Sequence, residues 1–128
     1  MLRVKVELRP SAIHGLGVFT VGALAAGTVV AGWDATEDFV LTAAEYRALP
    51  PGLVRLLAPY VWTDAAGRVY GTADEGRFTN HSETPNLRHE AQSGLMVAAR
   101  DIAAGEELTE NYEEYDAAFR TYAREVNG

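Results

Sequence analysis

The sequence predicts one domain of mainly β structure, and three observations support this class. The 128 residues contain no linker or low-complexity stretch, so residues 1–128 are read as a single domain. Short apolar segments alternate with turns rich in Gly, Pro, Asn and Asp, as is typical of consecutive strands. Helical signals are few and short.

The first predicted strand lies at the start of the chain, where apolar and charged residues alternate from Leu2 to Arg9 with the period of a half-buried strand. Pro10 ends it. Tight turns are predicted at Ala26-Gly27, Asp64–Gly67 and Ala91–Gly94. Further strands are expected on either side of these turns, at residues 18–21, 28–31, 60–63, 68–71, 87–90 and 95–99.

Three short helices are predicted. Thr42 and Glu45 have the spacing of a capping box and should begin the first helix, which Pro50-Pro51-Gly52 ends. Leu53–Leu57 should add another turn or two. The tail from Asp116 to Val126 has helical periodicity, with residues 119, 122 and 123 on one face.

An internal echo links two distant segments. Val21–Val30 and Ala99–Leu108 both consist of a strand, an apolar-Ala-Ala-Gly turn and a second strand. A corner used twice in the fold is slightly favoured over a common turn that occurs by chance. Two copies do not indicate a repeat protein.

Composition excludes several functional classes. The chain has no cysteine, which rules out disulfides and thiolate-bound zinc, and its three histidines lack metal-ligand spacing, so no metal site is expected. A net charge of −7 argues against nucleic acid as a direct ligand and suits a basic partner. The alternative is that the acidity only keeps the protein soluble. There is no apolar run for a signal peptide or a membrane span, so a cytoplasmic protein is expected.

Three motifs carry the functional signal. Gly15-Leu16-Gly17 lies between two predicted strands and would let the backbone approach a ligand closely, although a plain turn fits it equally well. Arg77–Asn86 reads Arg-Phe-Thr-Asn-His-Ser-Glu-Thr-Pro-Asn, an uncommon arrangement of amide, imidazole and hydroxyl side chains before a turn. Gly105–Tyr112 reads Gly-Glu-Glu-Leu-Thr-Glu-Asn-Tyr.

Together and in this order, these motifs resemble those of the SET-domain lysine methyltransferases. The resemblance covers roughly residues 3 to 116. The short length of the chain is similar to that of minimal viral and bacterial members of the family. It implies a β-clip-like fold of small, mostly antiparallel sheets with few helices. It also implies a C-terminal pseudoknot that brings Asn80-His81 next to Tyr112.

The resemblance further implies that the chain uses S-adenosyl-L-methionine to methylate a protein lysine. Tyr112 matches the catalytic tyrosine, and Tyr60 resembles a second tyrosine that lines the lysine channel. Asn80 should bind the amino-acid end of the cofactor, and the His81 backbone should pair with the adenine edge.

Further residues are expected to touch the cofactor. The backbone of Gly15-Leu16-Gly17 should lie along its methionine part, and the expected contacts also include His14, Phe78 and Tyr112. The expected substrate is a basic, lysine-containing protein that is histone-like or ribosomal, including a nucleoid-associated or host-nuclear one. The alternative is a non-catalytic SET-like module that binds a peptide or cofactor.

Three departures from the family pattern bear on the lysine channel. Glu83 stands where many members have cysteine, and the cysteine-rich module that helps to close the channel is missing. Tyr115, Phe119, Tyr122 or the second subunit of a homodimer would have to close it instead. Glu110 stands two positions before Tyr112, where many members carry an aromatic or aliphatic residue whose size affects how many methyl groups are added.

Overall fold

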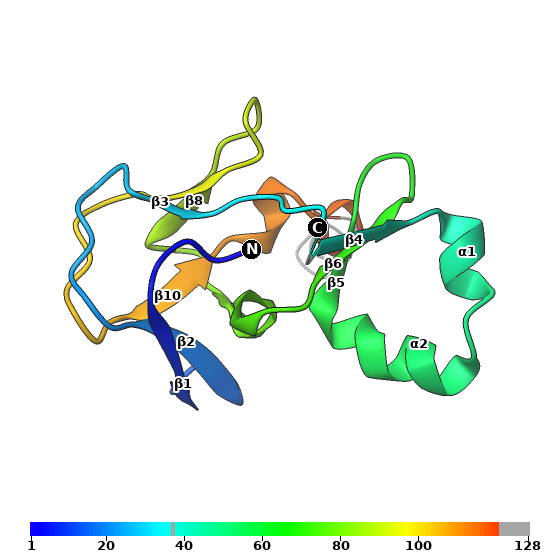
Figure 1. Cartoon of the computed structure of the whole chain (residues 1–128), viewed down its shortest axis with the longest axis horizontal. Helices are drawn as coiled ribbons and strands as arrows, with labels where there is room; N and C mark the ends of the chain where they lie inside the picture. The colour runs from blue at the N-terminus through cyan, green and yellow to red at the C-terminus, as the bar shows by residue number, and fades with distance from the viewer. Residues whose placement is uncertain (37, 121–128) are drawn as a thin grey trace.

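The computed structural model describes residues 1–36 and 38–120, which form three small β-sheets connected by loops and short helices (Figure 1). The predicted class of mainly β structure is confirmed. Within the described residues, no helix has the length and apolar character needed to cross a membrane.

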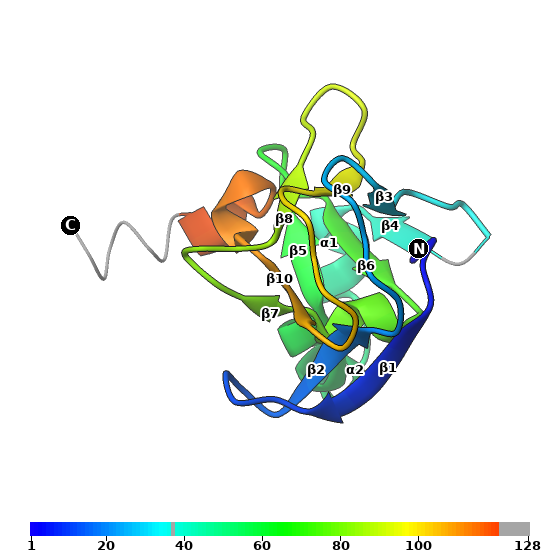
Figure 2. The ribbon, with the colours of Figure 1, turned by 90° about the vertical axis from the view of Figure 1, so that its left-hand side faces the viewer.

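The first sheet joins the beginning, middle and end of the chain. Its strand order is β1 (Val6–Pro10), β2 (Leu16–Thr20), β10 (Glu107–Glu110) and β7 (Asn80–His81). β10 pairs antiparallel with β2 and parallel with β7, and Figure 2 shows it between them. The strand that leads to Tyr112 is therefore the one that links the three motifs.

The other two sheets have three strands each. One has the order β3 (Val29–Ala31), β9 (Met96–Ala98) and β8 (Leu87–His89), and the other has β4 (Asp38–Leu41), β6 (Val69–Thr72) and β5 (Val61–Thr63). The predicted hairpins β5–β6 and β8–β9 are both present.

β4 and β7 are strands that the sequence patterns do not predict, and in β4 three apolar residues in a row follow Asp38. The register of β4 with β6 places Phe39 opposite Gly71. A Cβ atom at Gly71 would lie 2.2 Å from the Phe39 ring. The ring therefore occupies the space that a side chain at position 71 would need.

The short helices follow the predicted signals, with one difference. The capping box begins α1 (Ala43–Arg47), since the Thr42 hydroxyl accepts from the Glu45 N–H and the Glu45 carboxylate accepts from the Thr42 N–H. Pro51 does not simply end this helix but begins α2 (Pro51–Leu57), because proline at the first helical position loses no hydrogen bond. The two helices lie to one side of the sheets (Figure 1).

Single turns of 3₁₀ helix flank the functional motifs: η1 (Ala58–Tyr60), η2 (Glu75–Phe78) and η3 (Tyr112–Glu114). The helix predicted for the tail begins at Ala117 and is seen to Arg120. The rest of that predicted helix, including Tyr122, lies outside the described residues.

The two echoing segments form the same corner, and they pair with each other. Leu24 and Ile102 exchange two backbone hydrogen bonds of 2.8 Å across an isolated bridge. Gly27 and Gly105 occupy equivalent positions with φ values of 85° and 81°, a region that favours glycine. The echo in the sequence therefore marks a corner that the fold uses twice.

The core lies between the first two sheets and fixes β10. Leu108 of β10 is fully buried against Val18 of β2 and Leu87 of β8. Burying a side chain of this size contributes about 1.5–3 kcal/mol to stability, so β10 is held firmly where it carries the residues on either side of Leu108. The cluster consists of Val18, Val30, Leu87, Met96, Ala98, Ile102 and Leu108.

Candidate active site

Asn80 connects the first two sequence motifs. Its side chain is only 7 % exposed, and its amide nitrogen donates to the backbone carbonyls of His14 and Leu16 at 3.0 and 3.1 Å. The same nitrogen lies 3.2 Å from Oε1 of Glu107. Asn80 therefore holds the Gly-x-Gly segment against β7.

Gly17 leaves the space that the Glu107 side chain occupies. A Cβ atom there would lie 1.8 Å from Oε1 of Glu107, so the carboxylate that faces Asn80 would have to move. Gly15 has a different reason to be glycine, because its φ of +47° is left-handed while the space beside it is open. One glycine admits a side chain from β10, and the other shapes an exposed loop.

The residues of this region fit the amino-acid end of S-adenosylmethionine. Among the described residues nothing donates to Oδ1 of Asn80, although the nitrogen of the same amide is fully used. An amide oxygen is a suitable acceptor for an ammonium group. The exposed segment from His14 to Leu16 lies beside it.

Tyr112 is held at two points. Its backbone N–H donates to Nδ1 of His81 at 3.2 Å, and its hydroxyl donates to the backbone carbonyl of Thr79. The His81 ring also packs on the Tyr112 ring, with centroids 5.2 Å apart. Burial, with the charges of Glu110 and Asp116, raises the pKa of the Tyr112 phenol, which therefore stays protonated.

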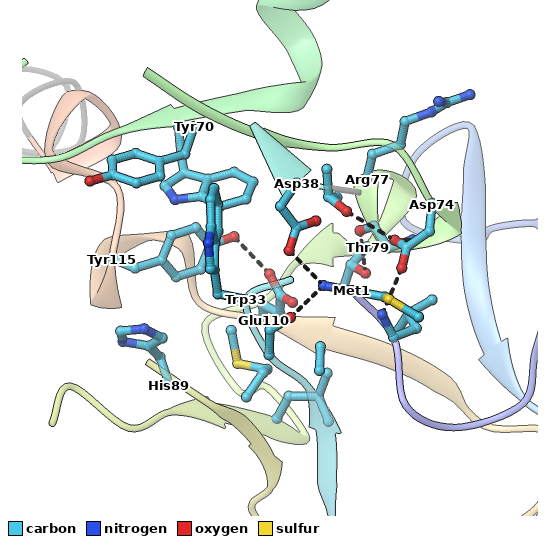
Figure 3. Close-up of a pocket in the computed structure, with 18 of the residues that line it drawn as sticks. Met1, Trp33, Asp38, Tyr70, Asp74, Arg77, Thr79, His89, Glu110 and Tyr115 are labelled. Carbon is cyan, nitrogen blue, oxygen red and sulfur yellow. Dashed lines mark hydrogen bonds and ion pairs between the residues drawn. The ribbon is translucent and has the colours of Figure 1, made fainter. Parts of the chain in front are cut away.

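Tyr112 lines a cavity of about 360 Å³. Figure 3 shows part of the lining of this cavity. Part of its wall is aromatic: the rings of Trp62 and Tyr70 stack, and Tyr115 meets Trp62 edge to face at 5.7 Å. Such a cavity suits the aliphatic stem of a side chain that ends in a cation. The aromatic lining residues are Trp33, Tyr60, Trp62, Tyr70, Tyr112 and Tyr115.

Tyr60 also lines this cavity, and its place in a lysine channel stays a prediction. Its ring packs edge to face against Phe78, with centroids 5.4 Å apart. Phe78 also packs against the hydrophobic core. Its position supports Tyr60, and its predicted contact with a cofactor stays a prediction.

The C-terminal aromatic residues lie where a cover for the channel is expected. Tyr115 lines the cavity directly, whereas Phe119 packs on the rings of His81 and Tyr112 at 4.8 and 5.4 Å. The role of these residues in covering a lysine channel stays a prediction.

Three aromatic residues of the cavity were not predicted to line a site: Trp33, Trp62 and Tyr70. Tyr70 could have been found, because the predicted hairpin over Asp64–Gly67 places it directly opposite Trp62. Trp33 carries no such signal, since it lies in the loop between β3 and β4 and reaches the cavity only through the tertiary fold.

Glu110 is the acidic group of β10 that faces this cavity. Its Oε2 accepts a hydrogen bond of 2.7 Å from the Tyr115 hydroxyl. Burial is the main cause that raises its pKa to about 7, and the hydrogen bond from Tyr115 opposes that shift. The group therefore changes its charge near neutral pH.

Comparisons with known proteins agree with this arrangement. The family model described as "SET domain" matches residues 15–113. The fold is similar to the crystal structure of a candidate histone methyltransferase from Plasmodium falciparum, with a TM-score of 0.60 and 20 % identity over 87 % of this chain and 95 % of that chain. At this identity the likeness shows the fold alone. No curated protein matches the sequence.

Proposed function

The chain belongs to the SET-domain family, and from that premise we propose that it transfers a methyl group from S-adenosylmethionine to a protein lysine. The observation that carries the proposal is the parallel pairing of β7 with β10. β7 begins with Asn80, and β10 leads directly to the cavity-lining Tyr112 at the start of η3. Members of this family are typically S-adenosylmethionine-dependent protein-lysine methyltransferases.

When bound, S-adenosylmethionine supplies a methyl group already activated by a sulfonium, so the protein mainly has to align an amine with it. In this proposal Asn80 accepts a hydrogen bond from the cofactor's ammonium through Oδ1. The backbone of Gly15-Leu16-Gly17, and with it His14, lies along the methionine part. The His81 backbone pairs with the adenine edge.

Tyr112 is the proposed catalytic residue. Because its hydroxyl hydrogen is directed at the Thr79 carbonyl, the oxygen lone pairs remain available to orient the amine and to contact the methyl hydrogens. Tyr60 and the other aromatic walls would hold the lysine stem and exclude water. A less hydrated amine is easier to deprotonate, which the reaction needs because lysine has a pKa of about 10.4 in water.

The proposed substrate is a basic segment of a protein, of the histone-like or ribosomal kind. The net charge of −7 supports this, because an acidic surface attracts a basic partner over long range. Acidic side chains also line the cavity itself, at Asp38, Asp74, Glu110 and Asp116.

The test is incubation with the labelled cofactor and a panel that contains core histones, ribosomal proteins and basic peptides. Mass shifts of one or more methyl groups on lysine are expected, and Tyr112→Phe should abolish them. Cofactor binding without any transfer to this panel or to a whole-cell extract would instead favour a non-catalytic binding module.

A further inference from the structure

Glu110 is one of four carboxylates that line the cavity, and it lies between aromatic side chains and the N-terminal end of the chain. Figure 3 shows its side chain reaching from β10 toward Tyr115, with Asp38 and Met1 on the opposite side. Oε2 is used by the Tyr115 hydroxyl, and among the described residues no group donates to Oε1. An enclosed carboxylate with one unused oxygen can accept a hydrogen bond or a proton from a ligand.

The surrounding charges do not provide Glu110 with a permanent partner. Arg77 lines the cavity, but its exposed guanidinium lies over the rings of Tyr60 and Phe78 and points away from the cavity in Figure 3. The Met1 amino group pairs with Asp38, and although its charge lowers the pKa of Glu110, no ion pair joins the two groups. The other titratable groups around this cavity and on η3 are Tyr60, Tyr70, Asp74, His89, Tyr112, Glu113, Glu114, Tyr115 and Asp116.

We propose that Glu110 binds the substrate ammonium at the end of the lysine channel and takes the proton that the amine must lose before methyl transfer. This inference rests on the proposed function, which it deepens by assigning the proton acceptor. A buried carboxylate costs stability unless it has a cationic partner, and the incoming lysine provides one.

The proton balance is simple. One N–H bond of the ammonium breaks and the proton passes to Oε1 of Glu110, so an ammonium and a carboxylate become a neutral amine and a carboxylic acid. The lone pair of the amine then forms a bond to the methyl carbon, and the electrons of the carbon–sulfur bond return to sulfur. Glu110 releases its proton to water before the next turnover.

Tyr115 fits this role as a positioning residue. Its hydroxyl fixes one oxygen of Glu110, and its ring packs against Trp62 and Tyr112. The carboxylate can therefore receive a proton without swinging out of the channel. A general base of this kind contributes about 10²- to 10⁴-fold to a rate.

The first experiment compares the wild type with Glu110→Gln and Glu113→Gln in methyl transfer to core histones from pH 6.5 to 9.5. Glutamine keeps the size of the side chain and can still accept from Tyr115, whereas Glu113 is an exposed neighbour outside the cavity and serves as the control. For Glu110→Gln, kcat/KM at pH 7 should fall at least tenfold. The difference in kcat/KM from the wild type should shrink as the pH approaches the pKa of free lysine, because more of the amine then arrives neutral. A profile parallel to that of the wild type would overturn the inference.

A second experiment does not need turnover. The carboxyl carbons of glutamate are labelled with ¹³C, the Glu110 signal is assigned from Glu110→Gln, and the protein is titrated with and without n-butylammonium chloride as a mimic of the lysine side chain. Butylammonium should lower the pH midpoint of Glu110 and leave Glu113 unchanged.

The Glu110 midpoint and the methyl-transfer assay distinguish ammonium binding at Glu110 from the proposed reaction. An unchanged Glu110 midpoint would contradict ammonium binding even if the wild type methylates histones. A shifted midpoint in a protein that transfers no methyl group would keep the ammonium site and remove the proposed reaction.

Discussion

The backbone N–H of Tyr112 donates a hydrogen bond to Nδ1 of His81, so the imidazole of one motif holds the main chain of the other. The pairing of β7 with β10 ends beside this bond, where Ser82 N–H donates to the Glu110 carbonyl at 2.8 Å. His81 thus fixes the point at which the chain turns toward the cavity.

Replacing His81 should displace Tyr112 and lower methyl transfer, with a smaller effect on the stability of the fold. His81→Phe keeps an aromatic ring but removes the acceptor, and we expect kcat/KM to fall about tenfold to a hundredfold because a small displacement of a catalytic group is costly. His81→Asn offers an oxygen near the position of Nδ1 and should retain more activity. Equal losses in both variants, measured by methyl transfer, would contradict this role.

Tyr112→Phe tests the hydroxyl alone. It removes the hydrogen bond to the Thr79 carbonyl and should lower kcat by about a hundredfold or more, while the free energy of unfolding changes by only about 1 kcal/mol. Tyr46→Phe is the matched control, since the Tyr46 hydroxyl also donates to a backbone carbonyl, that of Val54, away from the cavity. Chemical denaturation and methyl transfer measure the two effects.

Asn80 and Asn86 separate cofactor binding from stability. Both residues are buried, and both form hydrogen bonds to β10. Asn86 uses both ends of its amide: Nδ2 donates to the Glu107 carbonyl, and Oδ1 accepts from the Thr109 N–H. Asn80→Ala should weaken cofactor binding about tenfold or more, as loss of an acceptor for an ammonium implies. Asn86→Ala should destabilise the protein while the folded fraction keeps its affinity, as calorimetric titration can show.

Gly17→Ala should act through Glu107. The new methyl group displaces the carboxylate that lies beside the Asn80 amide, so cofactor affinity and stability should both fall. Gly15→Ala meets no atom and should cost only about 1 kcal/mol for its left-handed backbone. If Gly15→Ala weakens cofactor binding more than Gly17→Ala does, the proposed packing around Asn80 is wrong.

Glu110 should make the stability of the protein depend on pH. Its pKa is raised from 4.5 to about 7 in the folded state, so between these values the folded protein holds a proton that the unfolded chain has lost. Wild-type stability should therefore fall as the pH rises from about 4.5 through about 7. Glu110→Gln has no such titrating group and should not lose stability in this way. In urea denaturation its free energy of unfolding should be about 1–3 kcal/mol higher than that of the wild type at pH 8 and similar to it at pH 4.

The sequence predicts local structure well where a short signal suffices. The capping box of Thr42 and Glu45, the two hairpins and the repeated corner all depend on residues a few positions apart, and all are present. Pairings between distant segments are different. No periodicity predicts that β10 lies beside β7, and this neighbourhood was expected only because the motifs resemble a known family.

The residues that line the cavity could likewise be predicted only in part from the sequence. Tyr112 and Tyr60 were identified by resemblance, whereas Trp33 reaches the cavity from a loop without a motif. The burial of Glu110 against Tyr115 likewise depends on how the tail folds back after η3. Such contacts follow from tertiary packing, which overrides what neighbouring residues favour.

The central place of β10 also determines when the site can form during synthesis. Asn80 must meet the carbonyl of His14, 66 positions earlier, and β10 must then enter between β2 and β7. Contacts between such distant positions form slowly because a long loop has to close first. A nascent chain can therefore form neither the proposed cofactor site at Asn80 nor the cavity at Tyr112 until Tyr112 has left the ribosome. Binding of the cofactor would then indicate that these distant segments have come together.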